Sequence, residues 1–147
     1  MSDKQDLEPL LNAQQSQLNI SLADSSSIEN KALAILAGNT AILLFIGQVG
    51  FTFSAWWHWL VLLGPFLLSV ALIGIALWPR KYEGPLIALD NHPEYLEMRK
   101  DDLILQLLAD AQTAQRHNLQ LNTRRWKYCT LAILQTILGA IILFAIL

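Results

Sequence analysis

Residues 32–79 read ALAILAGNTAILLFIGQVGFTFSAWWHWLVLLGPFLLSVALIGIALWP, and residues 128–147 read YCTLAILQTILGAIILFAIL. Neither stretch contains an Asp, Glu, Lys or Arg. The first divides near a short link into two apolar segments, about 32–51 and 57–78, and the second is a single segment. Each has about 20 residues, which as a helix crosses a hydrocarbon core of ~30 Å. The sequence therefore predicts an all-α membrane protein with three transmembrane helices.

The rest of the chain is arranged around these spans. With 147 residues and 54% hydrophobic content, the chain has no room for a separate catalytic domain. Pro65 is expected to kink the second span, because proline removes a helical hydrogen bond. The predicted segments are a polar N-terminal segment (1–27), a transmembrane helical hairpin (28–79), a cytoplasmic connector with a coiled-coil-like helix (80–127) and the third transmembrane helix (128–147).

The positions of the basic residues predict the orientation. Eight of the ten Lys and Arg residues lie within 80–127, Lys31 precedes the first span, and the link between spans one and two has none. Basic residues beside spans are retained on the cytoplasmic side. We therefore expect the N-terminus and 80–127 in the cytoplasm, and the link and Leu147 on the opposite side.

Local signals suggest where the helices begin. Leucines at helical spacing over residues 6–19 fit a short amphipathic helix, with a flexible tail as the alternative. Ser26 and Glu29 have the spacing of a capping box, so the first membrane helix is expected to start near Ser27. A further helix is expected to begin at about Pro93 and to continue into the third span, giving a long cytoplasmic helix continuous with that span.

This cytoplasmic helix carries a heptad-like seam. Residues at alternating spacings of three and four keep one face toward a partner helix, and an Asn in such a seam fixes register and oligomer state. We expect the seam to mediate homo-oligomerisation; packing on a cytoplasmic extension of the first span in the same chain is the alternative. The seam residues are Ile104, Leu107, Ala111, Ala114, Asn118 and Leu121, followed by Arg125 and Tyr128.

Four uncharged polar residues within the spans are candidate functional groups: Asn39, Gln48, Gln135 and Thr136. Polar groups at membrane depth need partners, so these side chains should face other helices or water. Interhelical hydrogen bonds, the lining of a pore and a specific ligand site all remain open for them.

No residue pattern predicts an enzyme. The three histidines, His58, His92 and His117, are far apart and lack metal-ligand spacing, and no phosphate loop or catalytic triad pattern occurs. Cys129 is a lone apolar-type residue. We expect no catalytic residue, metal or cofactor. The net charge of −2 also argues against direct nucleic-acid binding.

The layout resembles small prokaryotic defence effectors of the Pycsar transmembrane and SLATT groups. The similarity covers about residues 27–147: Glu29-Asn30-Lys31-Ala32 enters the first span, a second span follows closely, and Asn118 precedes Lys127 by nine residues at the last span. The resemblance implies an effector that perturbs or permeabilises the bacterial inner membrane during abortive infection. Together with the apolar spans and the basic residues, it predicts a multi-pass inner-membrane protein with a periplasmic C-terminus. Pycsar effectors typically carry a cyclic-nucleotide sensor, which 27 N-terminal residues cannot hold.

Two functions are therefore expected, from different classes. The first is an oligomeric membrane effector in the lipid bilayer, triggered by a separate cytosolic sensor or enzyme partner. The second is a non-catalytic anchor or accessory subunit that organises a cytoplasmic enzyme complex at the membrane. A holin-like lysis protein is a more distant alternative.

Overall fold

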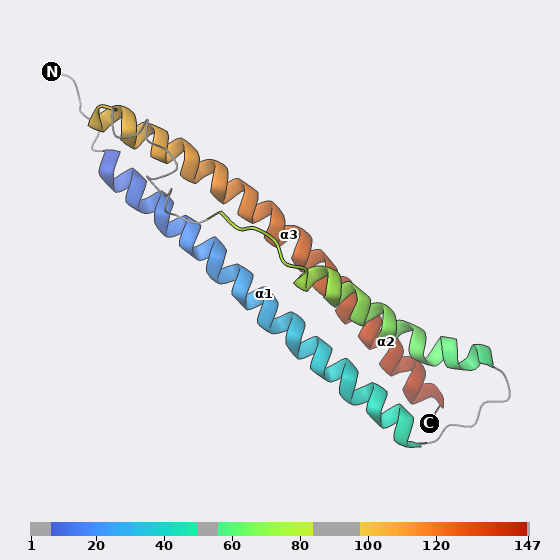
Figure 1. Cartoon of the computed structure of the whole chain (residues 1–147). Coiled ribbons are helices and arrows are strands. Elements are labelled where there is room, and N and C mark those ends of the chain that lie inside the picture. The colour runs from blue at the N-terminus through green and yellow to red at the C-terminus, as the bar shows by residue number, and fades with distance from the viewer. Residues whose placement is uncertain (1–6, 50–55, 84–97, 147) are drawn as a thin grey trace. The chain divides into compact units, whose positions relative to one another are not determined.

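The computed structural model describes residues 7–49, 56–83 and 98–146, and all of its secondary structure is helical. The elements are α1 (Leu7–Val49), α2 (Trp56–Leu77) and α3 (Lys100–Ile146), shown in Figure 1. The all-α class predicted from the sequence is confirmed for these residues. The predicted link near residues 52–55 and the connector around Pro85 and Pro93 lie outside the described part of the chain.

All three helices are long and apolar enough to cross a membrane. Within their most apolar windows, only 17% to 28% of residues are buried inside the protein. Large apolar side chains such as Leu44, Leu67 and Phe144 instead face outward. An outward-facing apolar surface of this extent is what a lipid environment accommodates and water does not. The fold is therefore that expected of a multi-pass membrane protein.

α1 differs from the expected arrangement, because it is one helix from Leu7 to Val49 and does not begin near Ser27. The proposed capping box at Ser26 and Glu29 therefore lies inside a helix, and this prediction was wrong. Serines in this region fit a helix interior: the Ser21 hydroxyl donates to the Leu18 carbonyl oxygen at 2.8 Å. Such back-bonding satisfies a serine without ending the helix.

α3 begins at Lys100, and Met98 and Arg99 before it are not helical. The helix start predicted at about Pro93 lies outside the described residues. The Leu103 amide donates to the Arg99 carbonyl oxygen at 2.9 Å, which makes Arg99 the residue that precedes the first turn. Asp101 and Asp102 lie in that turn, where acidic side chains are favoured by the helix dipole. Arg99 Nε also contacts Asp102 Oδ2 at 3.1 Å, which helps to fix this start.

α2 contains Pro65 and ends at Leu77, two residues before Pro79. Its N-terminal part departs in direction from the remainder (Figure 1), which fits the kink expected at the proline. The chain then continues without helix through Glu83.

The contacts divide the chain into two compact units. The first, which we call the polar unit, comprises Met1–Ser25 and Arg80–Asn122. Within it, Gln14 bonds to Gln115, and Asn122 bonds to Ser21, both across 101 residues of sequence. A constant sequence separation means that these parts of α1 and α3 run in the same direction.

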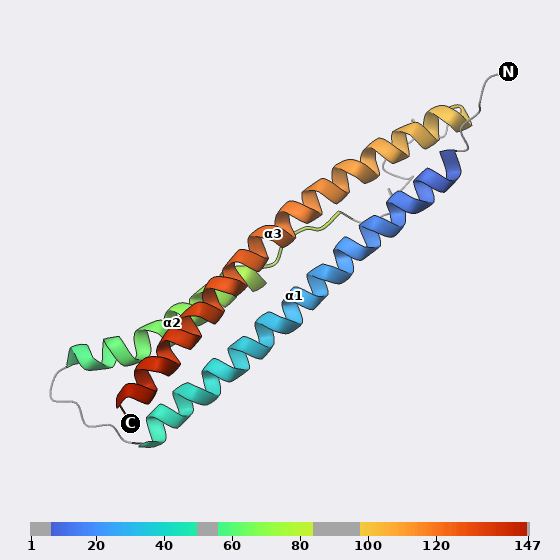
Figure 2. The ribbon, with the colours of Figure 1, turned by 180° about the vertical axis from the view of Figure 1, so that it is seen from behind.

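The second unit, which we call the apolar unit, comprises Ser26–Pro79 and Thr123–Leu147. α1 and α3 again run in parallel within it, as both views of the ribbon show (Figures 1 and 2), and α2 runs against them. Two apolar clusters form its core. One contains Ile28, Ala32, Ile73, Ala76, Cys129 and Ala132, and the other contains Ile46, Leu62, Phe66 and Leu143.

Candidate functional site

A layer of three polar side chains lies between the two apolar clusters of the apolar unit. Each helix supplies one: Asn39 from α1, Ser69 from α2 and Thr136 from α3. Asn39 Nδ2 donates to Ser69 Oγ at 2.8 Å, and Thr136 Oγ1 donates to Asn39 Oδ1 at 2.9 Å. Ser69 Oγ donates to the Ala132 carbonyl oxygen at 2.9 Å. These bonds join all three helices at one level.

The layer satisfies its own hydrogen-bonding needs. A hydroxyl has a single proton, so the arrangement in which Ser69 donates to Ala132 and Thr136 donates to Asn39 gives both hydroxyls an acceptor. Asn39 and Ser69 are fully buried, and no buried side-chain nitrogen or oxygen among the described residues lacks a partner. In this conformation the layer joins the three helices to one another.

The other two intramembrane polar candidates are placed differently. Gln48 is exposed near the end of α1, and Gln135 is half-buried on α3 beside Thr136. The structure therefore brings together two of the four predicted residues, Asn39 and Thr136, and adds Ser69 to them. Neither glutamine belongs to the hydrogen-bonded layer.

A buried arginine ties the three helices together at the end of α2. Arg125 Nε donates to the Ala76 carbonyl oxygen at 2.7 Å, and its Nη2 contacts Glu29 Oε1 at 2.9 Å. Carbonyl groups in the last turn of a helix have no intrahelical partner, and a cation is favoured there. The Arg125 side chain is only 3% exposed whereas that of Glu29 is 48% exposed, so the buried bond to Ala76 is the tighter constraint.

A second contact between α1 and α3 lies nearby. Lys31 Nζ is 5.0 Å from the centroid of the Trp126 ring, within the range of a cation–π interaction. Both side chains are exposed, as expected where a membrane helix meets the headgroup region. Arg125 and this pair together mark one boundary of the apolar unit.

In the polar unit, two asparagines one turn apart on α3 hold the segment that follows α2. Asn118 Oδ1 accepts from the Glu83 amide at 3.1 Å, and Asn118 Nδ2 donates to the Glu83 carbonyl oxygen at 2.9 Å. Asn122 Oδ1 accepts from the Tyr82 hydroxyl at 2.9 Å, and its Nδ2 donates to the Ser21 carbonyl oxygen at 2.7 Å. These asparagines therefore connect α1, α3 and residues 82–83.

The predicted seam residues are largely buried within the chain itself. Ile104, Ala111, Ala114 and Asn118 are buried, whereas Leu107 and Leu121 are only half-buried. Asn122 takes the buried position expected for Leu121, because an α-helix drifts relative to a strict seven-residue repeat. The contacts of the Asn118 side chain are with the chain's own backbone, so packing within the chain, the alternative to homo-oligomerisation, describes this arrangement. Self-association through the seam stays a prediction.

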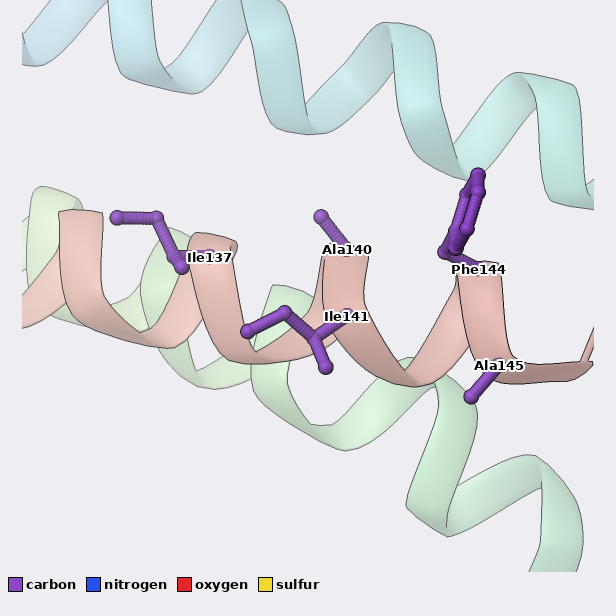
Figure 3. Close-up of a pocket in the computed structure, with 5 residues that line it drawn as sticks. All are labelled: Ile137, Ala140, Ile141, Phe144 and Ala145. Atoms are coloured by element: carbon purple, nitrogen blue, oxygen red, sulfur yellow. The ribbon is translucent and has the colours of Figure 1, made fainter.

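A pocket in the apolar unit is lined by α3 alone, by Ile137, Ala140, Ile141, Phe144 and Ala145 (Figure 3). Its lining contains no polar side chain, so it suits hydrocarbon and offers a polar ligand no hydrogen bond. No group of three or more His, Cys, Asp or Glu residues that could hold a metal occurs among residues 7–49, 56–83 and 98–146.

Several residues of these sites escaped the sequence reasoning. Ser69 was not among the predicted candidates, and nothing in its spacing pointed to Asn39. Ser21 and Ser25 are buried four residues apart on α1, a signal that the polar composition of the N-terminal segment obscured. Comparison of the chain with protein families, curated proteins and solved structures gave no match.

Proposed function

We propose that the protein is a non-enzymatic effector of the bacterial inner membrane, held in a closed resting state by the Asn39–Ser69–Thr136 layer. Three observations support a membrane role: the length of the helices, their outward-facing apolar side chains and the basic residues that flank their apolar stretches. The layer carries the proposal, because a hydrogen-bonded polar layer inside an apolar bundle is specific yet weaker than apolar packing. Such a layer allows the bundle to rearrange.

If the bundle rearranges, the polar side chains of the layer no longer bond helix to helix and instead form a polar surface. If the helices separate or rotate, Asn39, Ser69 and Thr136 lose partners and gain by contacting water or a second copy of the chain. Contact with water directly, or a path formed between copies of the chain, would then carry water through the level that the layer closes in the proposed resting state. The proposed activity is therefore perturbation or permeabilisation of the membrane, leading to depolarisation.

The polar unit is the proposed receiver of the trigger. α1 and α3 each contribute residues to both units, and we propose that α3 remains helical across the membrane boundary and that the termini have the orientation given by the positive-inside rule. A cytosolic partner that acts on the polar unit would then act on helices that also build the membrane bundle. The resemblance to Pycsar and SLATT effectors favours antiviral defence as the setting.

The test compares two threonines on α3. Thr130 Oγ1 and Thr136 Oγ1 each lie 3.0 Å from the carbonyl oxygen four residues earlier, but only Thr136 also contacts α1 and α2. We expect Thr136→Val to depolarise cells at lower expression than wild type, measured with a potential-sensitive dye, because the layer is broken. Thr130→Val should behave as wild type.

An accessory subunit is the second candidate. It is favoured by exposed apolar side chains on the polar unit that a partner protein could cover, namely Leu10, Ile20, Leu105 and Leu119. If neither wild type nor Thr136→Val changes the membrane potential at any expression level, the effector proposal is wrong and the accessory role is preferred. Equal depolarisation by Thr136→Val, Thr130→Val and wild type would remove the layer from the mechanism.

A further inference from the structure

The contact between Asn118 and Glu83 is made to the backbone. The asparagine amide accepts from the Glu83 N–H and donates to the Glu83 C=O, so it completes both hydrogen bonds of that residue. A primary amide that pairs with one residue in this way imitates a neighbouring peptide group. The Glu83 side chain takes no part in the contact, so the recognition depends on an extended backbone and not on the identity of the residue.

The neighbouring asparagine extends the same site. Asn122 follows Asn118 by one helical turn, so both side chains face the same side of α3. Asn122 contacts the hydroxyl of Tyr82 and also the backbone of α1 at Ser21. The two asparagines thus give one point of backbone recognition and one of side-chain recognition, for two consecutive residues of an extended segment.

The Asn118 and Asn122 side chains need hydrogen-bond partners at this position. Asn118 is fully buried and Asn122 nearly so, and both would lose hydrogen-bond partners if residues 82–83 moved away. Buried polar groups without partners are costly, which favours some occupant at all times. The contacts shown for residues 82–83 are hydrogen bonds to Asn118 and Asn122, with Lys81 and Glu83 exposed and Tyr82 half-buried. Another extended segment can therefore replace these residues by offering equivalent hydrogen bonds.

We propose that Asn118 and Asn122 form a binding site for an extended polypeptide segment, that residues 80–83 are its resident ligand, and that a cytosolic partner switches the protein by displacing them. The binding site rests on these contacts, and its role as a switch rests on the proposed function. Residues 80–83 follow α2 in the chain almost directly, since α2 ends at Leu77. Displacing residues 80–83 from Asn118 and Asn122 therefore frees the segment that follows α2, a proposed membrane helix.

Two matched pairs of variants test the site. Asn118→Leu removes both bonds to Glu83, whereas Gln120→Leu changes an exposed amide on the same helix. Glu83→Pro removes the recognised N–H, whereas Glu83→Ala retains the backbone. The full chain in nanodiscs is digested with trypsin, and cleavage after Lys81 is followed by mass spectrometry and normalised to the rate for the same variant in urea.

Cleavage requires the segment to leave its site, so losing one or both hydrogen bonds should accelerate it on the order of tenfold or more. We expect this for Asn118→Leu and Glu83→Pro, with Glu83→Ala and Gln120→Leu close to wild type. Unchanged cleavage in the first two variants, or an equal increase in all four, would overturn the binding site.

The role as a switch is read from the membrane potential of cells that express the same variants. Depolarisation by Asn118→Leu and Glu83→Pro at expression levels where wild type and both controls are silent supports it. A second outcome is that cleavage accelerates, strongly expressed wild type depolarises the cells, and the variants depolarise them no more readily than wild type does. That outcome refutes the switch and leaves the effector function standing. If no protein depolarises at any level, the effector function fails with the switch, and the cleavage rates still decide the binding site.

Discussion

Replacing Gly139 with Ala tests a close contact between α2 and α3. A Cβ added at Gly139 would lie 2.7 Å from Cζ of Phe66, 2.9 Å from Cε2 and 3.0 Å from Cε1. Carbon atoms in contact are normally about 3.5–4.0 Å apart, so the ring or the helix must move by roughly 1 Å. Phe66 is fully buried among Ile46, Leu62 and Leu143, which leaves the ring little space to yield.

The size of the effect follows from two opposing terms. Overpacking a buried site costs about 1–3 kcal/mol, while Ala is favoured over Gly within a helix by up to about 1 kcal/mol. Gly38→Ala and Gly74→Ala isolate the second term, because a Cβ at either position meets nothing within 4 Å. The free energy of unfolding of Gly139→Ala should therefore fall below that of these controls by about 1–3 kcal/mol.

The measurement is denaturation of the purified protein in mixed micelles, followed by helicity. Shortening the aromatic side chain should relieve the clash, so Phe66→Leu combined with Gly139→Ala should show strong non-additivity in a double-mutant cycle. Equal stability of Gly139→Ala and the two control variants would show that Phe66 does not pack on Gly139, and the α2–α3 contact described here would be wrong.

Three other changes probe the boundary of the apolar unit and its orientation. Arg125→Leu leaves the buried Ala76 carbonyl without a donor and should lower the free energy of unfolding by about 1–3 kcal/mol in the same micelle assay. A loss no larger than experimental error would contradict a stabilising bond between Arg125 and Ala76. Lys31→Met should cost no more than about 1 kcal/mol, since its contact with Trp126 is exposed, and a larger loss would indicate an additional partner. Alkaline phosphatase fused after Leu147 should be active in the periplasm, and an inactive fusion would reverse the assigned orientation.

The number and positions of the apolar spans could be read from the sequence, but the full length of α1 could not. Charge is absent from residues 32–79 and 128–147, and the cost of placing charge in lipid makes that absence a strong signal. The end of α2 was also predictable, because Pro79 cannot continue a helix. Helix starts were less predictable. The serines around Ser26 have the composition of a helix cap, but in the structure they lie inside α1, which continues through them.

The sequence indicated which polar residues would need hydrogen-bond partners, but it did not indicate which residues those partners would be. Asn39 and Thr136 were singled out because polar groups at membrane depth need partners, and in the structure they bond to each other, which is one of the three roles left open for them. Asn118 was singled out by its place in a heptad, which favours a partner helix. Its actual ligand is the Glu83 backbone, and no side-chain pattern encodes a contact with a backbone group.

The sequence by itself determined which segments are apolar enough to leave water and which retain charge, because transfer free energy depends on residue type and length along the chain. Only the tertiary structure decided which helix faces which. Ser69 meets Asn39 across 30 residues, and Arg125 meets Ala76 across 49. Such pairings depend on helix rotation and offset, which are set by packing between distant side chains. The polar layer, the arginine tie and the site for residues 80–83 all exist only at that level.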